Sequence, residues 1–366
     1  MINVKVTLPL RVRKGPGKSY DVVANVYPSG QVITMDGIEE GEDLKGINKW
    51  YYRFNDKQEK QSYWAGRLTE TAGTLPWGIA ALKVADIWNG LNEFGQRAKV
   101  AVLDTGFNIA NTDISSGVKA YQSFLIDHPE QSTLNDMNDE FGHGSLCASL
   151  IGSRNKLATV GYAPECELYI AKISARGTAS YPDIIKGIRW AIEKEVDIIS
   201  VSYGGFKQDN DLNTIVAEAV NKGIVVVASI GDDFTFSNLV DGKFPALCPE
   251  SIAVGATDPD NKLAKISFLH QKTEIYAPGE KILAYTLNLT PDDCHDTAPE
   301  NCEGTSQSAA IVAGICALII SRHKALNKSF TASDIKQLIT TLFDPVQESA
   351  GLKLISPSKI FATLKT

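Results

Sequence analysis

Residues 183–229 decide the fold class: they read DIIKGIRWAIEKEVDIISVSYGGFKQDNDLNTIVAEAVNKGIVVVAS. Amphipathic helical patterns occupy residues 183–195 and 211–223, and the apolar runs 196–202 and 224–229 follow them. An apolar run without polar alternation predicts a strand that is buried on both faces. Such strands alternating with amphipathic helices are typical of a parallel sheet that helices cover on both faces.

The same pattern extends in both directions along the chain. Further apolar runs lie at residues 99–104, 168–173 and 252–256, and helical patterns lie at residues 306–323, 331–342 and 356–365. Together these patterns predict one α/β domain over residues 83–366.

Residues 1–72 have a different texture, in which short β-branched or aromatic runs are broken by Pro and Gly. Strands are expected in INVKVTL, PLRVR, DVVANVY, QVITMDG, KWYYRF and SYWAG, and turns in KGPGKSY, PSG and EEGED. This punctuation, without a helical pattern, predicts a small all-β barrel or sandwich. The expected organisation is an all-β domain at 1–72, a linker at 73–82 and the α/β domain at 83–366.

Composition excludes some classes of function. The 366 residues carry a formal net charge of −7, and the sequence has no long Lys/Arg run. A protein that binds the phosphate backbone needs a basic face, so no nucleic-acid partner is expected. The N-terminal MINVKVTLPLRVRKG lacks the apolar core of a secretory signal, and no stretch reaches the roughly 18 apolar residues of a membrane span. We therefore expect no membrane partner, and a cytoplasmic location unless the chain is a processed secreted form.

The six cysteines show no metal-type spacing. Cys147 and Cys316 lie in apolar helical patterns and are expected to be buried free thiols. Cys294 and Cys302 bracket the polar stretch CHDTAPENC. A disulfide between them and two reduced thiols both remain open.

Three residues are candidates for chemistry. Asp104 ends the apolar run AKVAVLD, and ligands of an open α/β sheet collect at the carboxyl ends of strands. His143 lies between two glycines in DEFGHGSLCASLIG, and Ser306 lies at the start of a long apolar helix in EGTSQSAAIVAGICALIISRH. Each residue also has an ordinary explanation, as a capping Asp, a solvated His and an N-cap Ser. Together they match one chain order in which an orienting Asp, a His base and a Ser nucleophile occur.

With these residues in place, the sequence resembles the subtilisin-like serine peptidase family. The blocks that carry the resemblance lie over roughly residues 75–345: VAVLDTG, FGHGSLCASLIG, GYAPECELYIAKI, DIISVSYGG, VVVASIGD, SIAVGA and GTSQSAAIVAGICAL. The resemblance implies a serine endopeptidase in which Ser306 is the nucleophile, His143 the general base and acid, and Asp104 the residue that orients His143. It also implies a polypeptide substrate and no required cofactor.

The same resemblance implies two segments that bind substrate. Ser202, Tyr203 and Gly204 resemble the strand that pairs with extended substrate and lines the first specificity pocket. Gly177, Thr178 and Ala179 resemble the opposing strand. A peptide held between them forms main-chain hydrogen bonds as the middle strand. Asp233, near the expected mouth of the pocket, is interpreted as a solvated rim charge or as an attractor of basic side chains.

One site residue departs from the family's pattern, and a possible calcium ligand matches it. In IVVVASIGDDF, Asp232 stands where the family usually has an Asn that donates a hydrogen bond to the oxyanion. Loss of that donor can cost on the order of 10²–10³ in turnover, so Asp232 is expected to have a raised pKa or to act at acidic pH. Asp113 matches a calcium ligand of the family, but GSRNKLATV (152–160) lacks the familiar ligand pattern. A structural calcium ion therefore remains open.

Residues 2 to about 70 resemble a bacterial SH3-like domain. The resemblance rests on RKGPGKSY followed by a strand, the Trp50-Tyr51 pair and Trp64-Ala65-Gly66. It implies a peptide or cell-wall ligand. The alternatives are a covering domain without a ligand, and the family's pro-segment, whose mixed α/β pattern is not seen here.

Two further functions compete with an active endopeptidase. A weakly active or inactive relative that binds extended peptide is favoured by Asp232, whereas the intact set of Asp104, His143 and Ser306 argues against it. The other alternative is a scaffold or cell-wall-binding protein led by residues 1–72.

Overall fold

The computed structural model describes most of the chain, in ranges separated by short gaps. The described residues are 2–6, 10–15, 22–27, 32–35, 37–44, 47–54, 60–64, 68–70, 76–125, 137–154, 159–233, 242–285, 299–349 and 351–364. The chain divides into two compact units, one made largely of residues 1–75 and the other of residues 76–154 and 159–366.

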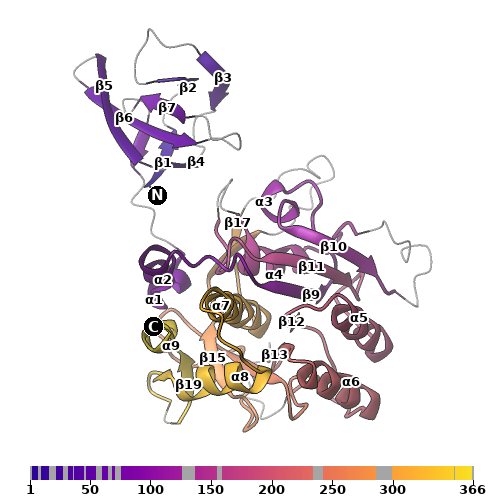
Figure 1. The fold of residues 1–366 in the computed structure, drawn as a ribbon. Helices are drawn as coiled ribbons and strands as arrows, with labels where there is room; N and C mark the ends of the chain where they lie inside the picture. The colour runs from indigo at the N-terminus through magenta and orange to yellow at the C-terminus, as the bar shows by residue number, and fades with distance from the viewer. Residues whose placement is uncertain are drawn as a thin grey trace. The chain divides into compact units, whose positions relative to one another are not determined.

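The larger unit is built on a nine-stranded sheet (Figure 1). In spatial order the strands are β10 (Val118–Ser123), β11 (Glu167–Lys172), β9 (Lys99–Asp104), β12 (Ile198–Val201), β13 (Val225–Ser229), β14 (Ile252–Thr257), β15 (Ile275–Pro278), β19 (Lys353–Ile355) and β18 (Phe343–Pro345). Every neighbouring pair is parallel except the last, in which β18 runs antiparallel to β19. The mostly parallel α/β sheet that the sequence predicts is confirmed.

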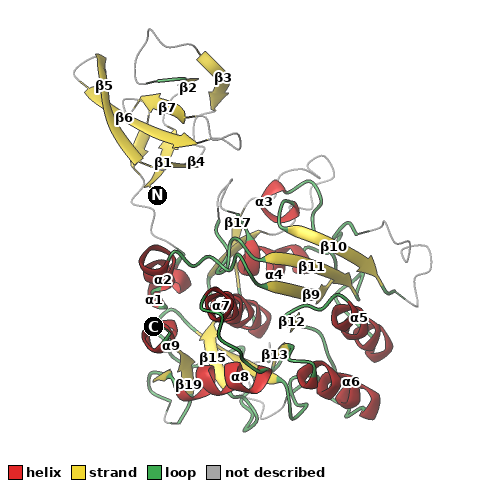
Figure 2. Ribbon diagram, viewed as in Figure 1, coloured by secondary structure: helices red, strands yellow, loops and turns green. Residues whose placement is uncertain are grey.

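Helices cover both faces of this sheet (Figure 2). On one face, α5 (Tyr181–Glu193) and α6 (Asn210–Asn221) form a continuous apolar cluster with strand residues that include Leu103, Val201 and Val226. Successive side chains of a strand point to opposite faces, so the remaining strand residues point to the other face of the sheet, where different helices pack. These helices are α7 (Thr305–Ala325), which packs on β12 to β15, and α4 (His143–Gly152), which packs on α7, β9 and β11.

Helix α7 is the centre of the unit. It is long and apolar enough to cross a membrane, but 94% of its apolar window is buried inside the protein. Its buried Ser308 hydroxyl is satisfied by the carbonyls of Ala277 and Pro278, at 2.9 and 3.1 Å. The helix is therefore a core element that is tied to the end of β15, and its first residues lie at a fixed place.

Several strands of this unit were not predicted from the sequence. Strand β10 has an alternating, half-exposed pattern, and β15, β18 and β19 are too short to be distinguished from loops. A separate antiparallel hairpin joins β16 (Ile282–Tyr285) and β17 (Pro299–Cys302). The remaining helices are α1 (Trp77–Ala81), α2 (Val84–Leu91), α3 (Thr112–Ser115), α8 (Ala332–Thr341) and α9 (Pro357–Thr363).

The described part of the smaller unit contains only strands, in two antiparallel sheets. One sheet has the order β4 (Val32–Met35), β1 (Ile2–Val6), β8 (Leu68–Glu70). The other has the order β3 (Val22–Tyr27), β2 (Leu10–Arg13), β7 (Lys60–Trp64), β6 (Ile47–Phe54), β5 (Gly37–Leu44). Here the sequence interpretation of EEGED as a turn is wrong, because these residues lie in β5, where Glu39 and Glu40 pair with Trp50 and Lys49 of β6. Acidic residues are poor strand formers, and ladder bonds to a neighbouring strand override that preference.

Candidate active site

Three neighbouring strands end at the candidate site. Asp104 is the last residue of β9, residues 202–204 follow β12, and Asp232 follows β13. The order β9-β12-β13 is parallel throughout, so these carboxyl ends meet at one edge of the sheet. This edge is where open α/β sheets bind ligands.

Asp104 and His143 are directly bonded. His143 Nδ1 lies 2.8 Å from Asp104 Oδ1 and 3.0 Å from Oδ2. Asp104 is 1% exposed, and the His143 side chain retains 20% exposure. Burial acts to lower the pKa of His143, but the charges and hydrogen bonds of Asp104 and Cys147 together act to raise it, and the net pKa lies well above 6.5.

The residues next to this pair hold it in place. The Gly144 N–H donates to Thr105 Oγ1 at 2.8 Å, and Thr105 Oγ1 donates to Asp139 Oδ1 at 2.8 Å. Asp139 is 1% exposed and also accepts from the Gly142 N–H at 2.7 Å and from the Ser145 N–H and hydroxyl at 2.8 and 2.7 Å. The first amides of a helix have no intrahelical acceptor, so Thr105 and Asp139 cap α4.

Only glycine fits beside His143 on the C-terminal side. A Cβ at Gly144 would collide with the Gly106 carbonyl oxygen and would lie 2.9 Å from the Gly106 nitrogen. This backbone contact brings the start of α4 against the turn after β9. The two glycines that flank His143 in the sequence are therefore explained in part by close packing.

Ser306 is the second residue of α7 and is 7% exposed. The preceding residue, Thr305, donates its N–H to Asp232 Oδ1 at 2.7 Å, and the Thr305 hydroxyl accepts from the Gly231 N–H at 3.2 Å. These bonds fix the N-terminus of α7 against the end of β13. They place the Ser306 backbone at the positive end of a long helix, next to Asp232.

The Asp232 carboxyl is largely buried, and burial raises its pKa, whereas the Thr305 N–H, Lys243 and His143 act to lower it. The direction is the one that the sequence analysis predicts. The charge of His143 is close enough to act on Asp232, which links the Asp104–His143 pair to the start of α7. Asp233 is 2% exposed, so its interpretation as a solvated rim charge is wrong.

The predicted substrate segments lie beside these residues. The Tyr203 ring meets the His143 ring edge to face, with 5.2 Å between ring centres. Gly204 touches the Phe244 carbonyl oxygen, and a Cβ there would collide with it. Ser202, Tyr203 and Gly204 are all half-buried.

The opposing segment lies in the loop between β11 and α5. Thr178 is exposed, and Gly177 and Ala179 are half-buried. The Phe141 ring, 49% exposed, lies against Gly177, where a Cβ would be 2.6 Å from its Cζ. Phe141 precedes His143 by two residues, so the opposing segment is in contact with the loop that carries His143.

The cysteines near the site are thiols. Cys147 is buried, and its sulfur lies 3.9 Å from His143 Nδ1. Burial raises the pKa of Cys147 to about 11. Cys147 and Cys316 are buried free thiols, as predicted, whereas Cys294 lies outside the described residues.

Two places in the larger unit contain potential metal ligands. Among the described residues, the only group of three potential ligands is Asp104, His143 and Cys147, whose ligand atoms lie within 4.8 Å of one another. The Asp104–His143 hydrogen bond already accounts for this arrangement. Asp113 is fully buried in α3, and its Oδ2 accepts from the Tyr285 hydroxyl at 2.7 Å. A calcium ion needs six to eight oxygen ligands, and among the described residues Asp113 belongs to no group of three potential side-chain ligands, so these residues alone do not form a calcium site.

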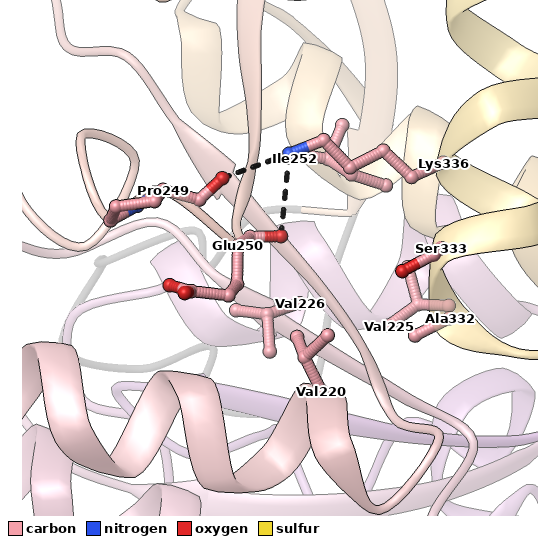
Figure 3. Close-up of a pocket in the computed structure, with 9 residues that line it drawn as sticks. All are labelled: Val220, Val225, Val226, Pro249, Glu250, Ile252, Ala332, Ser333 and Lys336. Atoms are coloured by element: carbon pink, nitrogen blue, oxygen red, sulfur yellow. Dashed lines mark hydrogen bonds between the residues drawn. The ribbon is translucent and has the colours of Figure 1, made fainter.

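A separate cavity of about 280 Å³ lies at the opposite edge of the sheet (Figure 3). Val225 and Ile252, the first residues of β13 and β14, contribute to its lining. Lys336 borders it and donates to the carbonyls of Pro249 and Glu250, at 3.1 and 3.5 Å. The cavity is therefore distinct from the candidate active site, which lies where the strands end.

Sequence reasoning missed Thr105, Asp139, Phe141 and Lys243 as members of the site. Asp139 could have been noticed, because an Asp a few residues before a helix start is a capping signal. Lys243 carries no local signal, because its position depends on long-range strand pairing.

A parallel α/β fold with a buried Asp–His pair and a Ser-bearing helix N-terminus at the carboxyl edge of its sheet is typical of serine hydrolases. The subtilase family model matches residues 95–352. Subtilisin NAT of Bacillus subtilis subsp. natto is 32% identical over 285 residues, which cover 77% of this chain and 71% of the relative. The major intracellular serine protease of Bacillus subtilis strain 168 is 31% identical over 299 residues, covering 78% of this chain and 90% of the relative. An intracellular serine protease of Paenibacillus polymyxa is 32% identical over 305 residues, covering 79% and 89%.

The chain belongs to the subtilase family, and it is a subtilisin-like serine endopeptidase. Its substrate is polypeptide, and catalysis in this family requires no cofactor.

Proposed function

We propose that Asp104, His143 and Ser306 form the catalytic triad of this endopeptidase. The observation that carries the proposal is the 2.8 Å bond between His143 Nδ1 and Asp104 Oδ1. It places the Nδ1 proton toward the carboxylate, so the Nε2 lone pair is free to act as a base.

The reaction then follows from these positions. His143 Nε2 takes the Ser306 hydroxyl proton as Ser306 Oγ bonds to the scissile carbonyl carbon. The same proton passes from His143 to the leaving amine, and the acyl-enzyme ester remains on Ser306. Water, deprotonated by His143, then hydrolyses this ester and restores Ser306.

A fluorophosphonate probe tests the triad. Wild-type protein should be labelled on Ser306, and Ser306→Ala should not be labelled. Ser308→Ala is the matched control, because Ser308 is two residues away on the same helix and its hydroxyl is bound to the Ala277 carbonyl. Labelling of Ser306→Ala to the wild-type extent would refute the assignment.

We propose that the Ser306 N–H and a protonated Asp232 stabilise the oxyanion. The start of α7 offers free backbone N–H groups and the positive end of a helix dipole. Asp232 Oδ1 accepts from Thr305, so a proton on Oδ2 is the donor that remains for the oxyanion. The burial that raises the pKa of Asp232 favours this protonated form.

We propose that extended peptide binds between residues 177–179 and residues 202–204 as a middle strand. Contact of Tyr203 with His143, and of Phe141 with Gly177, supports this position next to the reacting groups. An ionised Asp232 would instead favour the alternative function, in which peptide is bound and cleaved weakly. The same labelling experiment separates the two functions.

For Asp113 we propose a structural role through Tyr285 in place of a calcium site. The expected result is a thermal midpoint that is the same in EDTA and in excess CaCl₂. If calcium raises the thermal midpoint of the wild type and of Asp113→Asn equally, the calcium site lies elsewhere. A rise that Asp113→Asn abolishes would restore Asp113 as a ligand.

For the smaller unit we propose an SH3-like domain at residues 1–72 that binds a peptide or cell-wall ligand, followed by a linker at 73–82 and the peptidase domain at 83–366. The described residues of this unit form only β-strands, which supports an SH3-like domain. Within the proposed linker, α1 is bound to the peptidase unit, because Trp77 Nε1 donates to the Glu280 and Lys281 carbonyls at 3.1 and 3.0 Å. Co-sedimentation of the full chain, carrying Ser306→Ala, with purified peptidoglycan tests the ligand. Loss of binding in Trp50→Ala is expected.

A further inference from the structure

A lysine lies beside the proposed oxyanion site. The Lys243 N–H donates to the Ile230 carbonyl at 3.0 Å. The next residue, Phe244, donates its N–H to Gly205 O at 2.8 Å and accepts from the Gly205 N–H at 3.1 Å. These bonds hold Lys243 between the end of β13 and the segment that follows β12.

The Lys243 side chain passes Gly231 and ends against the ring of Phe206. Its Cδ lies 3.3 Å from the position that a Cβ would take on Gly231, the residue before Asp232. Its ammonium lies 5.4 Å from the ring centre of Phe206, which is 57% exposed. Phe206 in turn contacts Phe268, so the ammonium rests on an aromatic surface by a cation–π contact.

Lys243 has no anionic partner in the part of the chain that the structure describes. None of the ion pairs found there includes it. The charge of Lys243 acts to lower the pKa of Asp232, but the two side chains form no ion pair. Among the described residues, the Lys243 ammonium is therefore not held in an ion pair with any carboxylate.

We propose that Lys243 selects an acidic side chain, Glu or Asp, on the substrate residue that supplies the scissile carbonyl. The inference rests on the proposed function of Ser306, Asp232 and residues 202–204. In this binding mode the carbonyl oxygen of the substrate residue points at Asp232, and its side chain lies beside residues 202–205. Lys243 is next to Asp232 and next to this segment. A carboxylate there meets the ammonium above an apolar surface, where charge attraction is stronger than in bulk water.

The test uses peptide p-nitroanilides that differ only in the residue before the leaving group: Glu, Gln or Lys. At pH 7.5 the wild-type kcat/KM for Glu should exceed that for Gln by about three- to tenfold, in the range of a partly exposed charge pair. The ratio should shrink in 1 M NaCl, because salt screens the pair.

Charge reversal sharpens the test. Lys243→Glu should invert the order, so that the Lys peptide is cleaved faster than the Glu peptide, and Lys243→Met should remove the preference. Lys207→Gln is the control, because Lys207 is a nearby exposed lysine, and its Glu/Gln ratio should match wild type.

The outcomes are distinct. A wild-type Glu/Gln ratio of one or less, or a ratio that Lys243→Glu leaves unchanged, overturns the role of Lys243 while the protease stands. Failure to cleave every peptide, together with no fluorophosphonate labelling, overturns the proposed function and the inference together. If Lys243→Glu does not fold, the wild-type Glu/Gln ratio and its salt dependence still decide.

Discussion

The Gly144 N–H donates a 2.8 Å hydrogen bond to the Thr105 hydroxyl, and these two residues directly follow His143 and Asp104 in the chain. The bond therefore joins the end of β9 to the start of α4 one residue away from the Asp104–His143 contact. Because Thr105 also donates to the buried Asp139, its hydroxyl satisfies two partners that have no access to water. The position of His143 relative to Asp104 is thus fixed by the backbone and by side chains other than these two.

Thr105→Val should reduce both stability and activity. Val has the shape of Thr but no hydroxyl, so the Gly144 N–H loses its acceptor and Asp139 loses a donor. Unsatisfied buried groups cost about 1–3 kcal/mol each, which urea denaturation can measure. A displaced His143 should lower kcat by up to about 10²-fold, with KM little changed.

Thr105→Ser is the matched control, because it keeps the hydroxyl and loses only a methyl group. It should retain kcat close to wild type. Equal losses of kcat in the Val and Ser variants would show that packing of the methyl group matters and that the hydrogen bonds do not.

Asp139→Asn should destabilise the protein without touching substrate. Every group that faces the Asp139 carboxylate is a donor, namely the Thr105 and Ser145 hydroxyls and the N–H groups of Phe141, Gly142 and Ser145. An amide NH₂ placed among donors loses bonds to a charged acceptor, which are worth about 1.5–3 kcal/mol each. The midpoint of urea unfolding should fall clearly. Glu140→Gln, the same change at an exposed neighbour, should leave it in place, and an equal fall there would contradict the capping role.

The sequence could predict what depends on local pattern. The buried strands β9 and β11 to β14 and the long helix α7 follow from apolar runs, and Asp104 and Ser306 follow from their positions at element ends. The edge strand β10 could not be predicted, because its half-exposed alternation is weak. Lys243 and Thr105 could not be predicted as site residues either. Their roles depend on which strands become neighbours, and pairing over long sequence separations leaves no periodic signal.

In an Asp232→Asn background, where only His143 titrates, the pH dependence of kcat/KM should show an acid limb with a midpoint above 6.5. His143 must be neutral to act as a base, and despite burial its pKa is raised well above 6.5 by Asp104 together with Cys147. Activity should therefore rise as the pH rises through the folded-state pKa. Asp104→Asn removes the stabilising charge, so the limb should move to lower pH while kcat falls on the order of 10⁴. A midpoint below 6.5 in Asp232→Asn would contradict this.

Asp232→Asn should increase activity and simplify its pH dependence. The Asn Oδ1 atom can keep the bond from the Thr305 N–H, and the amide Nδ2 then takes the place of Asp232 Oδ2 as a donor at every pH. In the wild type the active form needs a protonated Asp232 and a neutral His143 at once, and these requirements oppose each other. The wild-type profile should therefore be bell-shaped, and the variant should show only the acid limb of His143.

The gain should be largest at pH 8, where Asp232 is most ionised, and should approach the 10²–10³ that one oxyanion donor is typically worth. Asp211→Asn is the matched control: it makes the same change in the first turn of α6, at an exposed position away from the sheet edge, and should leave kcat/KM unaltered. Stability should fall slightly in Asp232→Asn, because a negative charge at the start of α7 is lost. If Asp232→Asn is no more active than wild type at pH 8, Asp232 serves α7 as a cap and the oxyanion is stabilised by backbone N–H groups alone.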